Sequence, residues 1–258
     1  MVGQFDIRNV KWITGWKGLP ECYVKIKTPG VTSVINEMIP DPEMEEWVRK
    51  VGQAKVDEIM TNAGYRGTAM HLFIEKFITT FAKTKDPSEA LRVTQTDSPP
   101  ELVKEGIPQH KIDEGRELFY KFYYSEFSNK YENLISAELP IYSSSLFYRG
   151  ILDVFYSERV FGPSVTDFKT SNGYIKKGTV KELKYKYQLG GYAGALDEMY
   201  KDKGLVIKRA SILCVNTKSE GLQEVVCEGK ELQDFKERFK TLAIDWHKKN
   251  NQQYLIAV

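Results

Sequence analysis

Two short segments decide the fold: Gly150-Ile151-Leu152-Asp153 and Thr166-Asp167-Phe168-Lys169-Thr170. Each places an aspartate in a run of apolar residues that has the character of a β-strand. A single aspartate in such a strand is costly unless it is paired or ligates a metal ion. Asp167 and Lys169 are two residues apart and therefore share one face of their strand. Two carboxylates that converge can bind a hard divalent cation such as magnesium, and the adjacent lysine can orient or help to deprotonate a water beside it.

The composition limits the class of protein. The chain has 258 residues, of which 41% are hydrophobic, enough for one large domain with an ordinary buried core. The formal net charge is +2, so a nucleic-acid partner would need positive charge gathered locally. The 3 cysteines show no Cys-x-x-Cys spacing, which argues against a disulfide scaffold, a structural zinc site and an iron–sulfur cluster. No apolar run is long enough to cross a bilayer and no secretory signal is evident, so we expect a cytoplasmic protein without a membrane partner.

The N-terminal half is expected to contain helices and connecting segments. Asp41-Pro42 predicts a helix start, because Asp is a good cap and Pro suits the first helical position. The other expectations here are short strands and turns over 5–35, a helix from about 67 to 81, a long polar loop over 84–110, and a helix over 110–129.

The C-terminal half predicts a sheet with a helical crossover. The elements expected are strands over about 134–142, 147–157 and 164–170, a helix over 179–202, strands near 207–215 and 222–227, and a helix near 229–249. Three strands joined as hairpins and then a helix and a further strand give a central mixed sheet flanked by helices, which is an α/β fold. Asp153 and Asp167 would lie on adjacent strands and converge if those strands pair as a hairpin.

Four motifs follow one another along the chain. They are Gly67-Thr68-Ala69-Met70-His71, Gly150-Ile151-Leu152-Asp153, Asp167-Phe168-Lys169-Thr170 and Gln188-Leu189-Gly190-Gly191-Tyr192. In this order they resemble the PD-(D/E)XK nuclease superfamily in its RecB-like branch, which is marked by Gly-x-x-x-His, Gly-x-x-Asp, Asp-x-Lys-Thr and Gln-x-x-x-Tyr. Val31-Thr32-Ser33-Val34, with Trp47 and Gly52 before Arg66-Gly67-Thr68, further resembles the mitochondrial genome maintenance exonuclease group and its phage-encoded relatives. The resemblance covers roughly residues 29–200.

The resemblance implies a role for the matching residues. Asp153 and Asp167 would ligate the catalytic metal ion, magnesium or manganese, with the carbonyl of Phe168 as a further ligand. His71 would be another ligand or lie beside the ion. Lys169 would position the attacking water and stabilise negative charge at the phosphate.

For each of three further residues, two roles are open. Gln188 and Tyr192 would touch the substrate backbone or the catalytic lysine, although packing is an equally good role for Tyr192. Glu138 interrupts an apolar run and is either a core-edge acid or, as often in the resembled family, an acid near the metal ion. His71 and Glu75 lie one helical turn apart, so Glu75 could orient His71.

Positive charge gathers after the second aspartate strand. The lysines are 176, 177, 181, 184 and 186, against the single acid Glu182. Such a run is usually a solvated face, but beside a metal site it would hold a phosphate backbone. We therefore take Lys176, Lys177 and Lys184 as substrate contacts, together with Arg66 and Arg149, which each adjoin a motif glycine.

Two expectations concern aromatic and histidine side chains away from the motifs. Tyr120, Tyr124 and Tyr131 form a stripe that could stack on unpaired bases, although packing in the core is the more ordinary role of such residues. His247 is expected at the surface.

The resemblance implies a metal-dependent DNA exonuclease of the repair or recombination type that hydrolyses phosphodiester bonds from single-stranded DNA ends. A bacterial or phage origin, and so the cytoplasm of a bacterium or a phage-infected host, agrees with the lack of an import signal. The alternatives are a structure-selective endonuclease, a recombination-associated end-trimming nuclease that works with replication or recombination proteins, and a catalytically inactive DNA-binding module. The last is disfavoured because both aspartates and the lysine are present.

The expected fold is a restriction-endonuclease-like α/β core with an N-terminal helical cap. We treat residues 1–258 as a single nuclease domain. Its parts are N-terminal strands and a helix over 1–65, a helical cap or arch over 66–130, the catalytic core over 131–216, and a C-terminal strand and helix over 217–258. No Gly-x-x-x-x-Gly-Lys-Ser/Thr loop occurs, so any helicase would be a separate chain.

Overall fold

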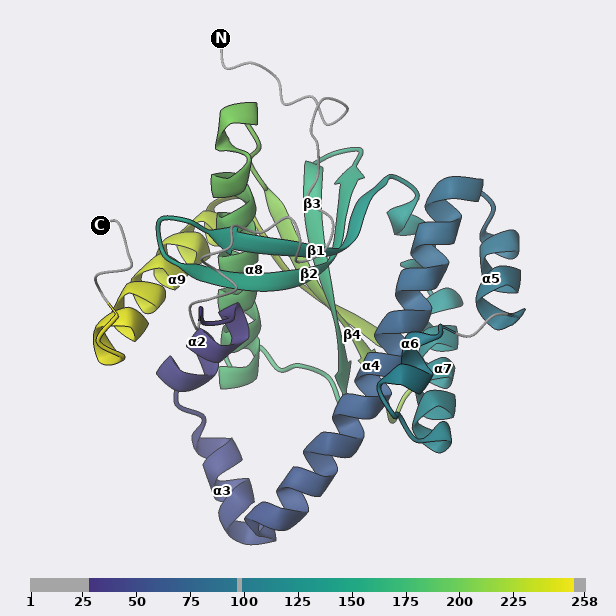
Figure 1. Ribbon diagram of the computed structural model, residues 1–258, viewed down its shortest axis with the longest axis horizontal. Helices are drawn as coiled ribbons and strands as arrows, with labels where there is room; N and C mark the ends of the chain where they lie inside the picture. The colour runs from purple at the N-terminus through teal and green to yellow at the C-terminus, as the bar shows by residue number, and fades with distance from the viewer. Residues whose placement is uncertain (1–27, 97–98, 253–258) are drawn as a thin grey trace.

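Five strands form one mixed sheet in the order β1-β2-β3-β4-β5 (Figure 1). The computed structural model describes residues 28–96 and 99–252. The pair β3 and β4 is parallel and the other neighbouring pairs are antiparallel. The strands are β1 (Leu134–Ser143), β2 (Tyr148–Glu158), β3 (Gly162–Ser171), β4 (Arg209–Asn216) and β5 (Leu222–Glu228). The predicted α/β class, with a central mixed sheet flanked by helices, is confirmed.

Helices precede the sheet, cross between β3 and β4, and follow β5. They are α2 (Val31–Met38), α3 (Pro42–Val51), α4 (Gln53–Thr84), α5 (Pro87–Thr96), α6 (Glu101–Lys104), α7 (Gln109–Tyr123), α8 (Val180–Met199) and α9 (Gly229–Lys249), with 3-10 turns η3 (Ser128–Tyr131) and η4 (Lys201–Lys203). Within the described residues, none of these helices has the combined length and apolar character needed to cross a bilayer.

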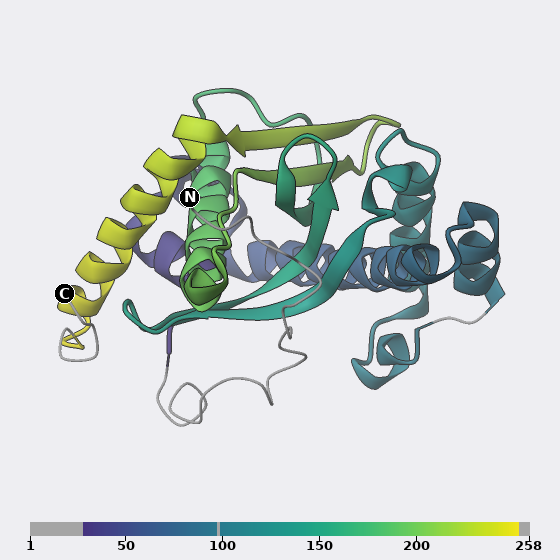
Figure 2. The ribbon, with the colours of Figure 1, turned by 90° about the horizontal axis from the view of Figure 1, so that it is seen from above.

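The sheet separates two hydrophobic cores, seen edge-on in Figure 2. On one side α8, α9 and α2 pack against it, with Leu196 and Phe239 fully buried among them. On the other side α4 and α7 bring an aromatic layer that includes Phe77 and Phe122. Burial of these large side chains supplies most of the driving force for the fold.

Three expectations about the N-terminal half are wrong. Residues 31–38 form a helix rather than strands, because Val31, Val34 and Ile35 lie at helical spacing and bury one face; the rest of the 5–35 prediction lies outside the described residues. Helix α4 begins at Gln53 instead of near 67, so its glycines are interior residues. The segment 84–110 holds the helices α5 and α6 rather than one long loop.

The helix start predicted at Asp41-Pro42 is confirmed. The Asp41 Oδ1 atom accepts a hydrogen bond from the backbone N–H of Met44 at 3.2 Å, and Pro42 takes the first helical position. The strands and helices predicted for the C-terminal half are also confirmed, with ends shifted by a few residues.

Helix α4 is held against α7 by a glycine. A Cβ atom added to Gly115 would lie 2.5 Å from the Cβ of Ala69 and 2.9 Å from the backbone N of Met70. Because a real side chain cannot approach that closely, only glycine allows the two helices this separation. Ala69 and Met70 directly precede His71, so this contact fixes the position of the motif histidine.

We predict opposite effects for two helical glycine substitutions. Gly115→Ala should destabilise the protein by about 1–3 kcal/mol, because the added methyl group overpacks the α4–α7 contact. Gly64→Ala, at an exposed position of α4 with nothing within 4 Å of the added Cβ, should stabilise it by about 0.5–1 kcal/mol. Chemical denaturation of both variants tests this, and a Gly115→Ala protein as stable as the parent would contradict it.

Candidate metal centre

The two motif aspartates lie where β2 and β3 separate. The strands pair from Glu158 opposite Gly162 as far as Val154 opposite Thr166. Beyond this last pair the next residues are Asp153 on β2 and Asp167 on β3. We call this point, where the two strands separate, the β2–β3 fork. The backbone N–H of Phe168 donates to the Asp153 Oδ2 atom at 2.6 Å, so a carboxylate takes the place of the missing strand partner.

Glu138 on β1 completes a row of three acids across neighbouring strands. The register of the flanking residues Ala137 and Leu139 puts Glu138 opposite Asp153. Glu138 has a φ of 47°, a left-handed conformation that costs energy for a residue with a side chain. Ala137 packs with the α4–α7 core and Leu139 with the α8–α9 core. The side chains before and after Glu138 therefore point to opposite faces of the sheet, although residues two apart in a regular strand share one face.

His71 reaches the fork from α4, on the aromatic side of the sheet. Its Nδ1 atom lies 3.4 Å from the Asp153 Oδ2 atom, and its ring meets the Phe168 ring edge-on at 6.2 Å between centroids. His71, Glu138 and Asp153 each offer a ligand atom, and these atoms all lie within 4.8 Å of one another. Two consecutive strands and the distant helix α4 thus supply one candidate metal centre.

Asp167 lies beside this trio and pairs with the lysine of its own motif. The Lys169 ammonium forms an ion pair with the Asp167 Oδ2 atom. The Asp167 side chain is 2% exposed and that of Lys169 is 29% exposed, so the ammonium lies between the buried acid and solvent. Lys169 is therefore held close to the acids while it remains accessible.

The acids are too close together for all of them to ionise easily. Burial, and then the charge of Asp153, raise the pKa of Glu138 to about 8. The same causes in the same order raise the pKa of Asp167 to about 6, although Lys169 opposes them. Burial also acts on Asp153, but the nearby His71 and Lys169 outweigh it and lower the pKa of that carboxyl.

His71 is drawn toward its charged form by the acids. Burial lowers its pKa, but the charge and hydrogen bond of Asp153 outweigh burial and raise the pKa above the usual value. Glu75, one turn further along α4, has its pKa raised by burial first and then by Glu101 and Asp153. The cluster as a whole carries more negative than positive groups.

The donor set fits a hard divalent cation. Carboxylates are the ligands that magnesium and manganese prefer, and an imidazole is also suited to manganese. Burial is the largest cause of the raised pKa values of Glu138 and Asp167, and repulsion by Asp153 is the second, which a cation at this point would relieve. His71, Glu138, Asp153 and Asp167 are the residues that would hold it, and the carbonyl of Phe168 stays a predicted ligand.

The four sequence motifs contact one another in pairs. A Cβ atom added to Gly67 would lie 3.9 Å from the Thr170 hydroxyl, and one added to Gly150 would lie 2.9 Å from the Tyr192 ring. The Gln188 side-chain amide donates to the Tyr192 hydroxyl at 3.1 Å, and both side chains are buried. Tyr192 therefore has a packing role, and its contact with substrate stays a prediction.

A cavity of about 600 Å³ opens beside Lys169. Helices α2, α3 and α4 form one wall, and β3 and α8 form the other. Of the predicted residues, Lys169, Lys184 and Gln188 line it. The sequence reasoning missed Trp47 and Tyr185 as wall residues, and it left Lys181 out of the substrate set, although the lysine run contains it.

The remaining basic residues lie elsewhere. Lys176 and Lys177 are exposed in the segment between β3 and α8. Arg66 pairs with Glu114 at 3.4 Å, on the side of α7. Arg149 lines a different cavity between α2 and α9. The structure does not bring Arg66 or Arg149 into the cavity beside Lys169, and the role of all four in substrate binding stays a prediction.

The surface expectation for His247 is wrong, and base stacking by Tyr131 is excluded. Tyr131 is fully buried, with its ring against those of Phe122 and Tyr156, so it cannot stack on a base. His247 is also fully buried, and its Nε2 atom lies 2.9 Å from the carbonyl oxygen of Leu146. For Tyr131 the ordinary role of core packing therefore holds, and His247, for which no motif gave a role, is buried by long-range contacts.

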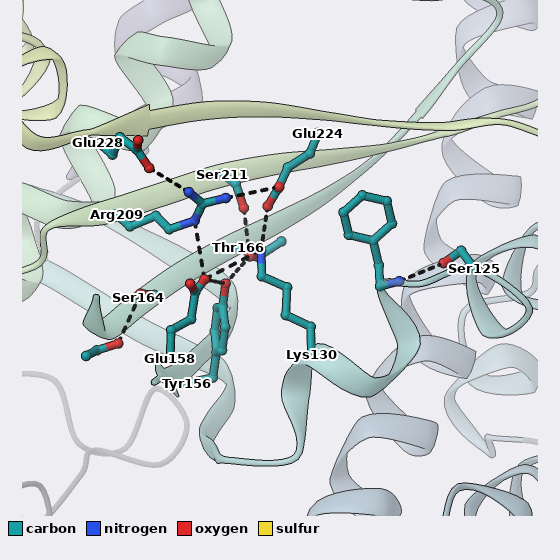
Figure 3. Close-up of polar contacts among 12 residues, drawn as sticks. Ser125, Lys130, Tyr156, Glu158, Ser164, Thr166, Arg209, Ser211, Glu224 and Glu228 are labelled. Carbon is teal, nitrogen blue, oxygen red and sulfur yellow. Dashed lines mark hydrogen bonds and ion pairs between the residues drawn. The ribbon is translucent and has the colours of Figure 1, made fainter. Parts of the chain in front are cut away.

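A second charged cluster, at the other end of β2 and β3, differs from the fork because each of its three glutamates pairs with Arg209 or Lys130 (Figure 3). Arg209 contacts Glu158 at 3.3 Å, Glu224 at 3.1 Å and Glu228 at 2.6 Å. Lys130 contacts Glu224 at 2.6 Å and Glu158 at 3.5 Å. Every carboxylate here has a cationic partner, as expected of a cluster that braces the sheet.

We predict that metal-free protein loses stability as the pH rises, and that Glu138 is one cause. The folded-state pKa of Glu138, about 8, exceeds the ordinary value of 4.5. The folded state therefore binds this proton more tightly than the unfolded state, and the stability that it contributes is lost between about pH 4.5 and 8. Glu138→Gln should flatten this fall and should weaken the stabilisation by added magnesium or manganese at pH 8.

Thermal melts of both proteins in chelator and in metal, across that pH range, measure the effect. Asp202→Asn, at an exposed acid on η4, is the matched control and should follow the parent. Equal pH slopes for the parent and Glu138→Gln would contradict the prediction.

Comparison with known proteins gives little beyond this geometry. No family model matches the chain, and no curated protein matches it. Among solved structures, one from Eubacterium rectale, named as a candidate exonuclease, aligns with a TM-score of 0.42 and 12% identity, over 71% of this chain and 68% of that one.

Proposed function

We propose that the protein is a metal-dependent DNA nuclease, and specifically an exonuclease that acts on single-stranded DNA ends. The observation that carries the proposal is the β2–β3 fork. Glu138 and Asp153 meet His71 there, Asp167 lies opposite Asp153 on the next strand, and Lys169 lies at the solvent side of Asp167. This combination is what hydrolysis of an anionic diester requires.

The chemistry of phosphodiester cleavage explains each part. A bound divalent cation would neutralise the phosphate and lower the pKa of a water that attacks it. Asp153 is fixed from two sides, because its Oδ2 atom accepts the Phe168 N–H and faces the His71 ring. Asp167 holds the Lys169 ammonium, which would stabilise the negative charge that develops on the phosphate.

The proposed preference for single-stranded DNA ends does not rest on the fork. The preference for DNA ends and for single strands comes from the resemblance of the four motifs to RecB-like nucleases. The same resemblance suggests work in repair or recombination beside other DNA-processing proteins. The cationic wall of Lys169, Lys181 and Lys184 agrees with a polyanionic substrate.

We predict that Asp167→Asn and Lys169→Ala each reduce cleavage of end-labelled DNA by a factor of about 100–1,000, because the first removes a predicted metal ligand that also holds Lys169, and the second removes the cation that would stabilise charge on the phosphate. Lys203→Ala, at a half-exposed lysine of η4, is the matched control and should cleave normally. Excess chelator should also stop the parent protein. Normal cleavage by either site variant, or cleavage that persists in chelator, would refute the assigned site.

We predict that the parent protein degrades linear single-stranded DNA and leaves a closed circle of the same sequence intact. An exonuclease needs a free end, whereas an endonuclease does not. Gel analysis of the two substrates with magnesium makes the comparison, and one random nick in the circle beforehand should restore its degradation. Cleavage of the intact circle would assign endonuclease activity instead.

A further inference from the structure

The helix α3 has an apolar face that the fold does not bury. Met44, Trp47, Val48 and Val51 lie at the spacing of one helical face, yet none of the α3 residues is buried. Met60, from the first half of α4, is 51% exposed beside them. An amphipathic helix of a soluble protein normally buries such a face. Here Met44, Trp47 and Met60 instead line the cavity beside Lys169.

The facing wall of this cavity is cationic. Lys181 donates to the Ser171 hydroxyl at 3.1 Å and lies 5.9 Å from the centre of the Tyr185 ring. Within residues 28–96 and 99–252 no carboxylate pairs with Lys181, so its charge is available to a ligand. Lys184 pairs with Asp41 at 3.1 Å, and Lys169 pairs with Asp167.

We propose that this cavity is a nucleotide subsite, in which an unpaired nucleobase packs on Trp47 and its phosphate contacts Lys181; the inference rests on the proposed nuclease function. A nucleotide combines a flat ring with an anionic group, and the two walls match these two parts. The volume of about 600 Å³ falls within the roughly 300–1,000 Å³ of small-ligand pockets. Because Lys169 belongs to both the cavity and the fork, the next phosphate of the same strand would lie at the candidate metal centre.

The charge of the surroundings favours this cavity, whose lining has three lysines against the acids Asp41 and Glu43, over another aromatic one. Tyr120 and Tyr124 line a cavity on α7, and Tyr124 is 78% exposed. The other residues of that rim include three acids, Glu117, Glu126 and Glu220, against Lys121. Lys121 already donates to the carbonyl oxygens of 216 and 219, so that rim repels a phosphate backbone.

The subsite would select unpaired strands. In a duplex both faces of a base are covered by its neighbours, so an aromatic side chain can contact a base face only where the strand is single. Trp47 is therefore a specificity residue in this proposal, and its contribution should be separable from that of the phosphate contacts.

Binding measurements on the full chain with Asp167→Asn, which keeps bound DNA uncut, test the proposal. The probes are a labelled oligothymidylate and an abasic strand of equal length, compared by fluorescence anisotropy. The Asp167→Asn protein should bind the thymidylate about tenfold more tightly than the abasic strand. Adding Trp47→Leu, which keeps apolar volume, should abolish that difference, and adding Trp47→Phe should keep most of it.

Lys181→Ala gives the complementary result. It should weaken binding of both strands equally and lower the slope of log Kd against log salt concentration by about 0.7, the value for one phosphate contact on a single strand. Trp47→Leu should leave that slope unchanged. A base preference that survives Trp47→Leu, or one that is lost in Tyr124→Ala instead, would overturn the subsite.

Cleavage by the otherwise unaltered enzyme separates the two proposals. Trp47→Leu should raise KM for linear single-stranded DNA about tenfold, with kcat little changed. Metal-dependent cleavage with an unchanged KM would remove the subsite and leave the nuclease. A base preference that depends on Trp47, in a protein whose parent cleaves no DNA, would remove the nuclease and leave a site for unpaired nucleotides.

Discussion

Mutual repulsion among buried carboxylates is the constraint on which the rest of the site depends. Asp153 stays ionised because His71, Lys169 and the Phe168 N–H all face it. Its charge is then a principal reason, after burial, why Glu138 and Asp167 give up their protons less readily. The cluster around Arg209 shows the opposite case in the same sheet, because there each acid meets a cation. At the fork Asp153 meets His71 and Asp167 meets Lys169, whereas no ion pair of Glu138 occurs within the described residues, which is the arrangement that a bound cation would complete.

The backbone creates this constraint by breaking regular pairing at one level of the sheet. β2 and β3 separate after Val154, and β1 turns its face at Glu138 through a left-handed φ. Glu138, Asp153 and Asp167 lie opposite one another across the three strands, and directly opposite residues of a sheet share one face. The break in pairing leaves the Phe168 N–H to the Asp153 carboxylate, and α4, held against α7 at Gly115, brings His71 to the acids.

The sequence predicted the sheet well because its signals there are local. Alternating apolar residues identified β1 to β3, and the motif order put Asp153 and Asp167 on neighbouring strands. The failures have a common cause in long-range packing. Val31–Met38 is rich in β-branched residues and became a helix because its face meets α8, and Tyr131 and His247 are buried by distant segments. The conformation of Glu138 leaves no signal in a single sequence, since nothing in residues 137–140 requires a positive φ.

The position of α3 contributes little to the stability of the fold. Asp41 caps α3 through Oδ1 and pairs with Lys184 of α8 through Oδ2, so one side chain ties this helix to the core. With no buried residue of its own, α3 gains little from packing, and its apolar side chains face a cavity rather than the core. Burying Trp47 in the core would have stabilised the chain more than its present position does. Its placement beside the acids and lysines is therefore better explained by a ligand than by the fold.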